Sequence, residues 1–257
     1  MSDIRPSIIP NLINVCNENI KRGFSNLSLF EVGPIFKGDK YEDQYNVVTG
    51  IRCGNKIKKN WKNLEVKFDF YDIKSDVLAV LNVLEFSVSR LKIYSEAPDY
   101  FHSGRSALFK LGNTIIASFR QINPLCLNLK DKKIEFFAFE IYLDKIPLPK
   151  KKIFSKPLLK LNYLQSISRD FSFLISNELN VEDLIYEIKL VNKLLIQKIS
   201  VFDIYQGNNI PEDKKSVSLS IIIQPIDKSL TDDDLEKLSS QIIDSVFKKF
   251  GAEIRSL

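Results

Sequence analysis

The sequence of 257 residues is short of several residue types on which enzyme chemistry often depends. It contains a single histidine, His102, and only 9 glycines. One histidine cannot supply a histidine pair or a three-histidine metal site, and so few glycines disfavour a set of glycine-rich phosphate loops. The composition therefore argues against many classes of enzyme before any motif is considered.

Cysteine is scarce as well, since the chain has only Cys16, Cys53 and Cys126 and no C-x-x-C pair. An odd number of widely spaced cysteines in a chain of this size is not a disulfide framework. The first residues contain no signal-peptide core, and no run of about 18 apolar residues occurs that could cross a bilayer. We therefore expect a cytoplasmic protein that is neither exported nor embedded in a membrane.

What the chain does have is 44% hydrophobic residues, enough to build one large domain or two ordinary ones. The clearest seam is the segment 147–160, which is rich in proline and lysine and has neither helical nor strand periodicity. We predict domains at residues 1–150 and 162–257, joined by a basic linker at 151–161. The net charge of +5 falls within residues 1–150, because the remainder is balanced.

Residues 1–150 are predicted to mix helices and strands. Apolar spacing predicts one helix over 10–22 and another from about residue 74 to 84, with Asp72 or Ser75 as its cap. Gly112 and Asn113 are typical of a two-residue β-hairpin loop. The expected strands are 27–36, 106–111, 114–119 and 134–143.

Residues 162–257 follow the order β-α-β-β-α-β of the ferredoxin-like fold. The two helices are expected to begin after Asn180 and Thr231, and Asp234 is placed to complete a capping box with Thr231. The expected strands are 169–175, 199–205, 216–224 and 253–257. The predicted fold class is therefore α+β: a partial antiparallel sheet module followed by a ferredoxin-like domain.

Period-two alternation in these strands predicts a sheet with one packed and one open face. The packed face is expected to hold Phe171, Phe173, Phe202, Ile204, Val217 and Leu219. The open face is expected to hold Asp170, Ser172, Asp203, Tyr205, Ser216, Ser218 and Ser220. A tyrosine on a sheet can stack on an unpaired base, and a carboxylate can accept from the donor edge of guanine. An ordinary solvated face is the alternative interpretation.

Other candidates for chemistry are weaker. His102 has no evident partner for general-base catalysis, so we interpret it as a structural or interface residue. Three consecutive aspartates from Asp232 favour helix capping over cation binding, because acidic side chains stabilise the first turn of a helix. Neither a catalytic residue nor a metal site is predicted. Four lysines of the seam could contact phosphate or lie in a solvated linker: Lys150, Lys151, Lys152 and Lys156.

Eight short blocks of the sequence resemble, in the same order, the β subunit of bacterial phenylalanyl-tRNA synthetase. Several ordered blocks are far more specific than one motif, and these extend over essentially the whole chain. They are 4–12, 29–36, 101–107, 169–171, 201–207, 214–216, 230–232 and 250–255.

The resemblance implies that residues 1–150 form a class II synthetase-like module that packs against the α subunit without being catalytic. A working class II site needs an arginine in its motif-two strand, and Leu29–Phe36 has none. Met1 aligns inside this module, so the chain is expected to be a C-terminal portion of the family's β subunit. Two positions depart from the family pattern: Ser103 replaces a usual proline, and Gln121–Pro124 lacks a usual histidine.

The resemblance further implies that residues 162–257 form a ferredoxin-fold anticodon-binding domain. Tyr205 would stack on the first anticodon base of tRNA(Phe), with Asp203, Ser172 and Ser216 around the polar edge of that base. The implied assembly is α2β2, in which ATP and Mg²⁺ are used by the holoenzyme and no cofactor is held by this chain; neither DNA nor a membrane is an expected partner. The alternative from the residues alone is a ferredoxin-like protein-interaction or small-ligand regulatory module with no role for tRNA.

Overall fold

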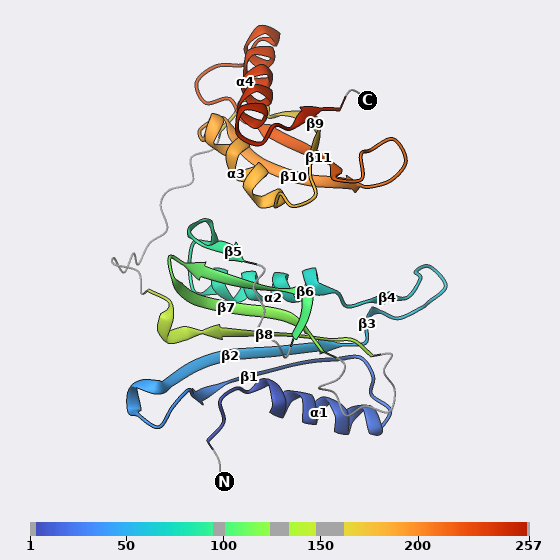
Figure 1. Ribbon diagram of the computed structural model, residues 1–257, viewed down its shortest axis with the longest axis vertical. Coiled ribbons are helices and arrows are strands. Elements are labelled where there is room, and N and C mark those ends of the chain that lie inside the picture. Colours follow the sequence, from blue (N-terminus) through green and yellow to red (C-terminus); the bar gives the residue numbers. More distant parts are fainter. Residues whose placement is uncertain (1–3, 95–100, 124–133, 148–161, 256–257) are drawn as a thin grey trace. The chain divides into compact units, whose positions relative to one another are not determined.

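The computed structural model describes residues 4–94, 101–123, 134–147 and 162–255, with only the backbone described at Ser89 and at 101–105 (Figure 1). The chain divides into two compact units, Met1–Phe154 and Ser155–Leu257, which we call unit 1 and unit 2. The predictions for the His102 and Ser103 side chains lie outside the described residues. So do the predicted linker and its lysines, Lys150, Lys151, Lys152 and Lys156.

Unit 1 is built on an antiparallel six-stranded sheet in the order β1-β2-β8-β7-β6-β5. The strands are β1 (Leu27–Phe36), β2 (Gln44–Cys53), β5 (Lys92–Tyr94), β6 (Phe101–Leu111), β7 (Thr114–Ile122) and β8 (Phe136–Tyr142). The predicted hairpin is confirmed, because β6 and β7 pair around Gly112, whose φ of +59° suits a glycine. The strand β2 was not predicted, because burial on both faces removes the alternation of its second half.

Two helices cover opposite faces of this sheet: α1 (Ile9–Lys21) and α2 (Phe70–Val83). The buried hydrophobic residues that pack with α1, called the α1 cluster, include Phe136 and Ala138 of β8. Those that pack with α2, called the α2 cluster, include Phe137 and Phe139 of the same strand. Since successive residues of a strand point to opposite faces, each helix buries one side of β8. Smaller elements are η1 (Tyr41–Asp43), η2 (Val88–Arg90), η4 (Leu143–Lys145) and the two-stranded sheet of β3 (Asn55–Ile57) and β4 (Val66–Lys67).

The start of α2 corrects the sequence prediction, because the helix begins at Phe70 and its cap is Asp69. The Asp69 carboxylate accepts hydrogen bonds from the backbone N–H groups of Tyr71 (2.7 Å) and Asp72 (3.0 Å). The Asp72 carboxylate accepts in return from the Asp69 N–H at 3.0 Å, which completes a capping box. Leu84, the last residue of the predicted helix, is the C-cap residue and is exposed.

Two cysteines that are distant in the sequence are neighbours in unit 1. Cys16 of α1 and Cys53 of β2 are free thiols buried in the α1 cluster. A side-chain hydrogen bond with Cys53, together with burial, raises the pKa of the Cys16 thiol. Cys126 lies outside the described residues.

Unit 2 has the predicted βαββαβ order and confirms the α+β class. Its sheet has the strand order β10-β11-β9-β12, and all pairs are antiparallel. The elements are β9 (Ile167–Ser176), α3 (Val181–Val191), β10 (Ile196–Tyr205), β11 (Lys214–Ile223), α4 (Asp232–Phe250) and β12 (Glu253–Ile254). None of the helices in the described parts of the two units is long and apolar enough to cross a membrane.

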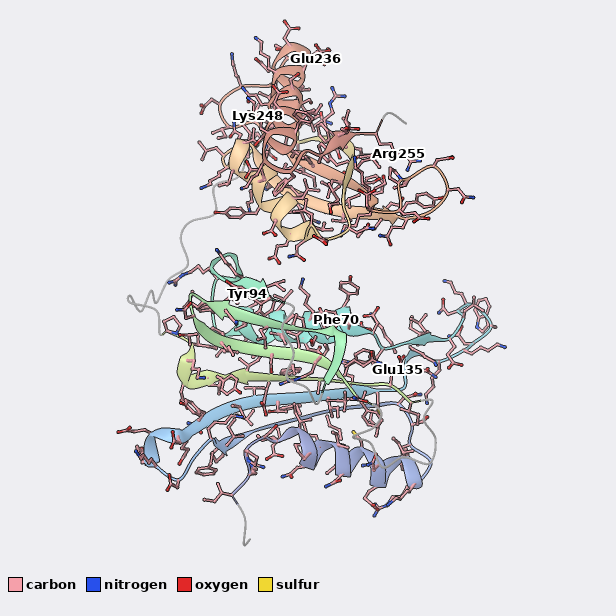
Figure 2. All side chains as sticks on the ribbon, in the orientation of Figure 1. Phe70, Tyr94, Glu135, Glu236, Lys248 and Arg255 are labelled. Atoms are coloured by element: carbon pink, nitrogen blue, oxygen red, sulfur yellow. The ribbon has the colours of Figure 1, made fainter. Side chains whose placement is uncertain are left out.

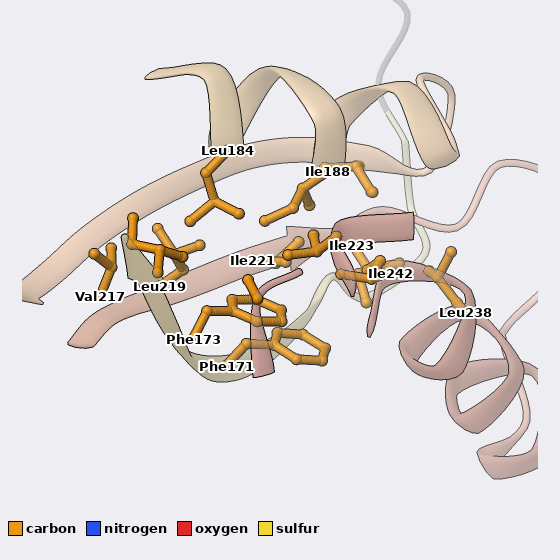
Figure 3. Packing of buried hydrophobic residues seen from close by; sticks show 14 of the residues in the cluster. Phe171, Phe173, Leu184, Ile188, Val217, Leu219, Ile221, Ile223, Leu238 and Ile242 are labelled. Atoms are coloured by element: carbon orange, nitrogen blue, oxygen red, sulfur yellow. The ribbon is translucent and has the colours of Figure 1, made fainter. Parts of the chain in front are cut away.

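Both helices of unit 2 pack on the same face of its sheet. Figure 3 shows Phe171 and Phe173 of β9 directed into the same core as Leu184 and Ile188 of α3. Leu235, Leu238, Ile242 and Val246 of α4 complete this core. No helix of the described residues of unit 2 covers the opposite face of the sheet.

The helix ends of unit 2 agree with the capping prediction at α4, and at α3 in the position of the N-cap residue only. The predicted box at α4 is confirmed: the Thr231 hydroxyl accepts from the Asp234 N–H, and the Asp234 carboxylate accepts from the Thr231 N–H. Hydrogen bonds from the Thr231 backbone and hydroxyl lower the pKa of Asp234. Asn180 is the N-cap residue of α3, but its side chain forms no capping hydrogen bond.

Candidate nucleic-acid interface

The open face of the unit 2 sheet is lined by serines that bond to one another across strands. Ser168 of β9 lies 3.0 Å from Ser220 of β11 between hydroxyl oxygens. The hydroxyl of Ser172 lies 3.0 Å from that of Ser218 and 3.2 Å from that of Ser216. The serines therefore satisfy one another and form a polar floor in the middle of this face.

The edge strand β10 departs from the predicted alternation through a bulge between Val201 and Asp203. Phe202 is the additional residue, and its side chain is 60% exposed instead of packed. Ile204 lies opposite Val217, on the helix side of the sheet, but it is 52% exposed because it is near the end of an edge strand and outside the helix-covered cluster. The packing predicted for these two residues was therefore wrong.

The same bulge places the candidate residues on the open face. Val201 pairs with Leu219 on the core side, so strict alternation would turn Asp203 toward the helices. After the bulge, Asp203 instead pairs with Ser218, and Tyr205 pairs with Ser216. The extra residue in β10 is thus the reason that a carboxylate and an aromatic ring stand beside the serine floor.

All four predicted residues meet on three neighbouring strands, but they differ in accessibility. Asp203 is exposed and Tyr205 is 40% exposed, so both can contact a ligand directly. Ser172 and Ser216 are buried, at 8% and 2% exposure. Asp203 and Tyr205 are therefore accessible to a ligand, whereas Ser172 and Ser216 belong to the buried serine floor.

Arg255, which sequence analysis missed, lies next to the aromatic ring. The backbone N–H of Arg255, which is labelled in Figure 2, donates to the Ser172 carbonyl at 2.7 Å. Its guanidinium carbon lies 5.8 Å from the centroid of the Tyr205 ring. Because Arg255 follows β12 and Tyr205 ends β10, the two side chains meet above β9 and β11. The only signal in the sequence is the position of Arg255 in the last of the eight blocks.

Gly207 is the second residue that sequence analysis missed. A Cβ atom added at Gly207 would lie 2.8 Å from the Tyr205 hydroxyl oxygen and 3.0 Å from the ring carbon that bears it. The Tyr205 hydroxyl also donates to the Asn208 carbonyl at 3.4 Å. The turn after β10 therefore closes on the tip of the tyrosine, and it does so because residue 207 has no side chain.

This arrangement is suited to recognition. It offers the partly exposed ring of Tyr205, the Arg255 cation over that ring and the carboxylate of Asp203, two residues before Tyr205 on the same strand. Aromatic rings stack on bases without regard to sequence, and carboxylates accept from amino and imino groups on base edges. In the described parts of the chain, His, Cys, Asp and Glu side chains form no group of three or more that could hold a metal ion.

Comparison with known families covers both units. The family model of the phenylalanyl-tRNA synthetase β-chain CLM domain matches residues 1–143, more than half of the chain. The chain belongs to the phenylalanyl-tRNA synthetase β-chain family. A second model, the ferredoxin-fold anticodon-binding domain, matches residues 163–255 and so includes every residue of the open face named above.

Curated relatives of this β-chain family match along nearly the whole chain. The phenylalanine–tRNA ligase β subunit of Rhodospirillum rubrum is 38% identical over 254 residues, and that of Paramagnetospirillum magneticum is 36% identical over 253 residues. The Brucella abortus protein is 37% identical over 261 residues. These alignments cover 98 to 99% of this chain but only 32% of each relative, so the chain spans about a third of their length.

The β-chain module of unit 1 contains a row of buried polar side chains that sequence analysis also missed. Glu140 of β8 lies between Thr49 of β2 and Ser118 of β7 in the sheet register. Its carboxylate accepts from the Ser7 hydroxyl at 2.7 Å and from the Ile8 N–H at 3.4 Å. Glu140 therefore ties the segment before α1 to the centre of the sheet, which gives this buried carboxylate a structural task.

Proposed function

We propose that this chain is the part of a phenylalanine–tRNA ligase β subunit that docks the α subunit and binds the anticodon region of tRNA(Phe). Aminoacylation would take place on the α subunit of an α2β2 enzyme in the cytoplasm, with ATP and Mg²⁺ bound there. The contribution of this chain would be to hold the tRNA so that its acceptor end reaches that site. Its own chemistry would be recognition without bond making.

The observation that carries this proposal is the exposed ring of Tyr205 beside the Asp203 carboxylate. The first anticodon base would stack on the open part of the ring, and Asp203 would accept from the donor edge of a guanine. The Arg255 guanidinium over the ring adds a cation near the RNA phosphates. Ser172 and Ser216, bonded to each other under this layer, would hold the floor against which the base rests.

The docking part of the proposal is supported by the exposed edge of unit 1. The edge strand β1 exposes Phe30 by 76% and Val32 by 56%. Val32 pairs with Val48, which packs against the α2 cluster, so these side chains continue an apolar face. Large exposed apolar side chains grouped at a sheet edge are typical of a surface that a partner buries.

The test is tRNA(Phe) binding and aminoacylation by the αβ enzyme reconstituted with Tyr205→Ala. Loss of stacking on one base should weaken tRNA binding roughly 5- to 150-fold and raise KM for tRNA accordingly. Tyr205→Phe is the matched control, because it keeps the ring and should stay close to the wild type. An unchanged affinity in Tyr205→Ala would refute the role of the ring.

Gel filtration with purified α subunit tests docking. Co-elution is expected, and Phe30→Ser with Val32→Ser should weaken it, because a polar pair would replace the apolar contact. A chain that neither co-elutes with the α subunit nor binds tRNA(Phe) would instead fit a ferredoxin-like protein-interaction or small-ligand regulatory module.

A further inference from the structure

A lysine-rich hairpin extends from unit 1 beyond its six-stranded sheet. We call residues 56–67 the basic arm; they include most of β3, the connecting turn and β4 (Figure 1). Every residue of the arm is exposed. Neither its turn nor its strands are therefore explained by the packing of a core.

The turn of the basic arm is nevertheless well defined. The side-chain oxygen of Asn60 accepts from the N–H groups of Lys62 (2.9 Å) and Asn63 (2.8 Å). The Asn60 N–H donates to the Asn63 carbonyl at 3.1 Å. These hydrogen bonds close a tight turn of the kind that asparagine favours, so the backbone that carries the side chains at the tip has a defined conformation.

Most of the net charge of the protein is concentrated on this arm. It contains five lysines and one glutamate, a net charge of +4, whereas the whole chain has +5. Among the described residues, Lys56 is the only arm lysine with an ion pair, to the Asp72 carboxylate of α2 at 2.5 Å. The other four, Lys58, Lys59, Lys62 and Lys67, are therefore available for a negatively charged partner.

The same tip carries an exposed aromatic side chain. Trp61, the only tryptophan of the chain, is 96% exposed, and its neighbours along the chain include Lys59 and Lys62. Cations that follow a phosphate backbone, combined with an aromatic ring on which a base can stack, are typical of single-stranded nucleic-acid binding. Protein–protein interfaces are instead depleted in lysine. The composition of the tip therefore favours RNA over a protein partner.

We propose that the basic arm binds RNA, with Lys58, Lys59 and Lys62 on phosphates and Trp61 stacked on an unpaired base. The RNA is the tRNA(Phe) of the proposed function, on which this inference rests. The arm gives unit 1 an RNA contact of its own, separate from the open face of unit 2. Binding of RNA by the arm would also give a role to the net positive charge, which lies in residues 1–150 and not in unit 2.

The first experiment measures tRNA(Phe) affinity of the reconstituted αβ enzyme over a range of salt concentrations. The triple variant Lys58→Gln, Lys59→Gln, Lys62→Gln should flatten the slope of log K against log salt by about 2 to 3, since each phosphate contact contributes roughly 0.7 to 0.9. The matched control removes the same charge elsewhere, with Lys40, Lys92 and Lys237 changed to Gln. Equal slopes for the two triple variants would overturn the proposal.

The second experiment replaces the ring at the tip. Trp61→Ala should weaken tRNA(Phe) binding roughly 5- to 150-fold at fixed salt, whereas Trp61→Phe should retain most of it. If arm variants lose co-elution with the α subunit and leave the salt slope unchanged, the arm is a protein interface and the proposal is wrong.

Tyr205→Ala in the same assay separates this proposal from the proposed function. If Tyr205→Ala weakens binding and the arm variants do not, the arm proposal alone fails. If neither weakens binding, the function proposed for the whole chain fails with it. If the arm variants weaken binding and Tyr205→Ala does not, the arm stands and the anticodon contact is wrong.

Discussion

The two sheets of this chain differ in how their helices are distributed. In unit 1, α1 and α2 lie on opposite faces, so neighbouring residues of β8 are buried on both sides. In unit 2, α3 and α4 lie on one face, and the other face carries serines, a carboxylate and an aromatic ring. A sheet that is covered on both faces can present only its edges and hairpins to a partner. A sheet covered on one face can present the face itself.

This difference explains why the candidate contacts of the two units look unlike each other. In unit 2 the contacts are short side chains on a flat, largely uncharged floor around Tyr205. In unit 1 they are the apolar edge at Phe30 and a charged hairpin with Trp61 at its tip. With the functions proposed above, unit 2 would read base edges, whereas unit 1 would dock a protein surface and attract phosphate.

The largest effects on unfolding free energy are expected from substitutions of adjacent residues in one strand, which test whether both faces of each sheet are covered. Phe136 and Phe137 of β8 are buried on opposite faces, so alanine at either should cost about 3–5 kcal/mol of unfolding free energy. In β9, Phe173→Ala should cost as much, but Ser172→Ala on the open face should cost only about 1 kcal/mol. Urea unfolding of the four variants of the full chain measures these differences.

The four variants can contradict the comparison in two ways. If Ser172→Ala destabilises unit 2 as strongly as Phe173→Ala, the open face is packed. If either β8 variant is tolerated, one face of the unit 1 sheet is not covered.

The sequence predicted the regular parts of the fold well, because their signals are local. Alternation in 216–224 and helical spacing after Thr231 located β11 and α4 closely. The strand β2 was not predicted, because burial on both faces hides its period, and neither was the basic arm, because its residues are exposed and lack a period. The start of α2 was placed too late, because the capping box of Asp69 lies before the apolar stripe.

A smaller effect is expected at Gly207, the residue that lets the turn close on Tyr205. In Gly207→Ala the new methyl group would lie 2.8 Å from the present position of the tyrosine hydroxyl oxygen and would push the ring aside. Part of the stacking energy would be lost, so KM for tRNA(Phe) should rise roughly 3- to 10-fold. Unfolding in urea should change little, because the ring tip lies at the surface.

A double variant sharpens this test of the open face. Adding Tyr205→Phe to Gly207→Ala removes the oxygen that the methyl group meets first, so part of the affinity should return. An unchanged KM in Gly207→Ala alone would show that the position of the ring does not matter for tRNA binding.

The candidate site was only partly predictable for a physical reason. Asp203 and Tyr205 were assigned to the correct face, yet the packing of Phe202 and Ile204 was wrong, because a bulge changes the alternation within β10. Arg255 and Gly207 act through contacts with Tyr205 that depend on the turn after β10 and on the pairing of β12. Such contacts between separate segments have no periodic signal.

The smallest effect on unfolding free energy is expected from the side-chain contacts between α3 and α4, the two helices on one face of the unit 2 sheet. Glu187 of α3 accepts from the Ser245 hydroxyl of α4 at 2.7 Å and also pairs with Lys249. The hydrogen bond from Lys249, and then that from Ser245, lower the pKa of Glu187 below its usual value of 4.5. A lowered carboxyl pKa means that the stabilisation is complete above pH 4.5 and is lost as the pH falls through the folded-state pKa.

Glu187→Gln should therefore lower the unfolding free energy by less than about 1 kcal/mol at pH 7, since the pair is near the surface. The difference from the wild type should shrink as the pH falls through the lowered pKa of the Glu187 carboxyl, where the wild-type carboxylate takes up a proton. Glu236→Gln, at an exposed glutamate of α4, is the matched control for the loss of one carboxylate. Urea unfolding at pH 7 and at an acidic pH at which carboxyl groups are protonated measures both. A Glu187→Gln penalty that persists unchanged at the lower pH would mean that the charge of Glu187 does not help to hold α3 and α4 together on one face.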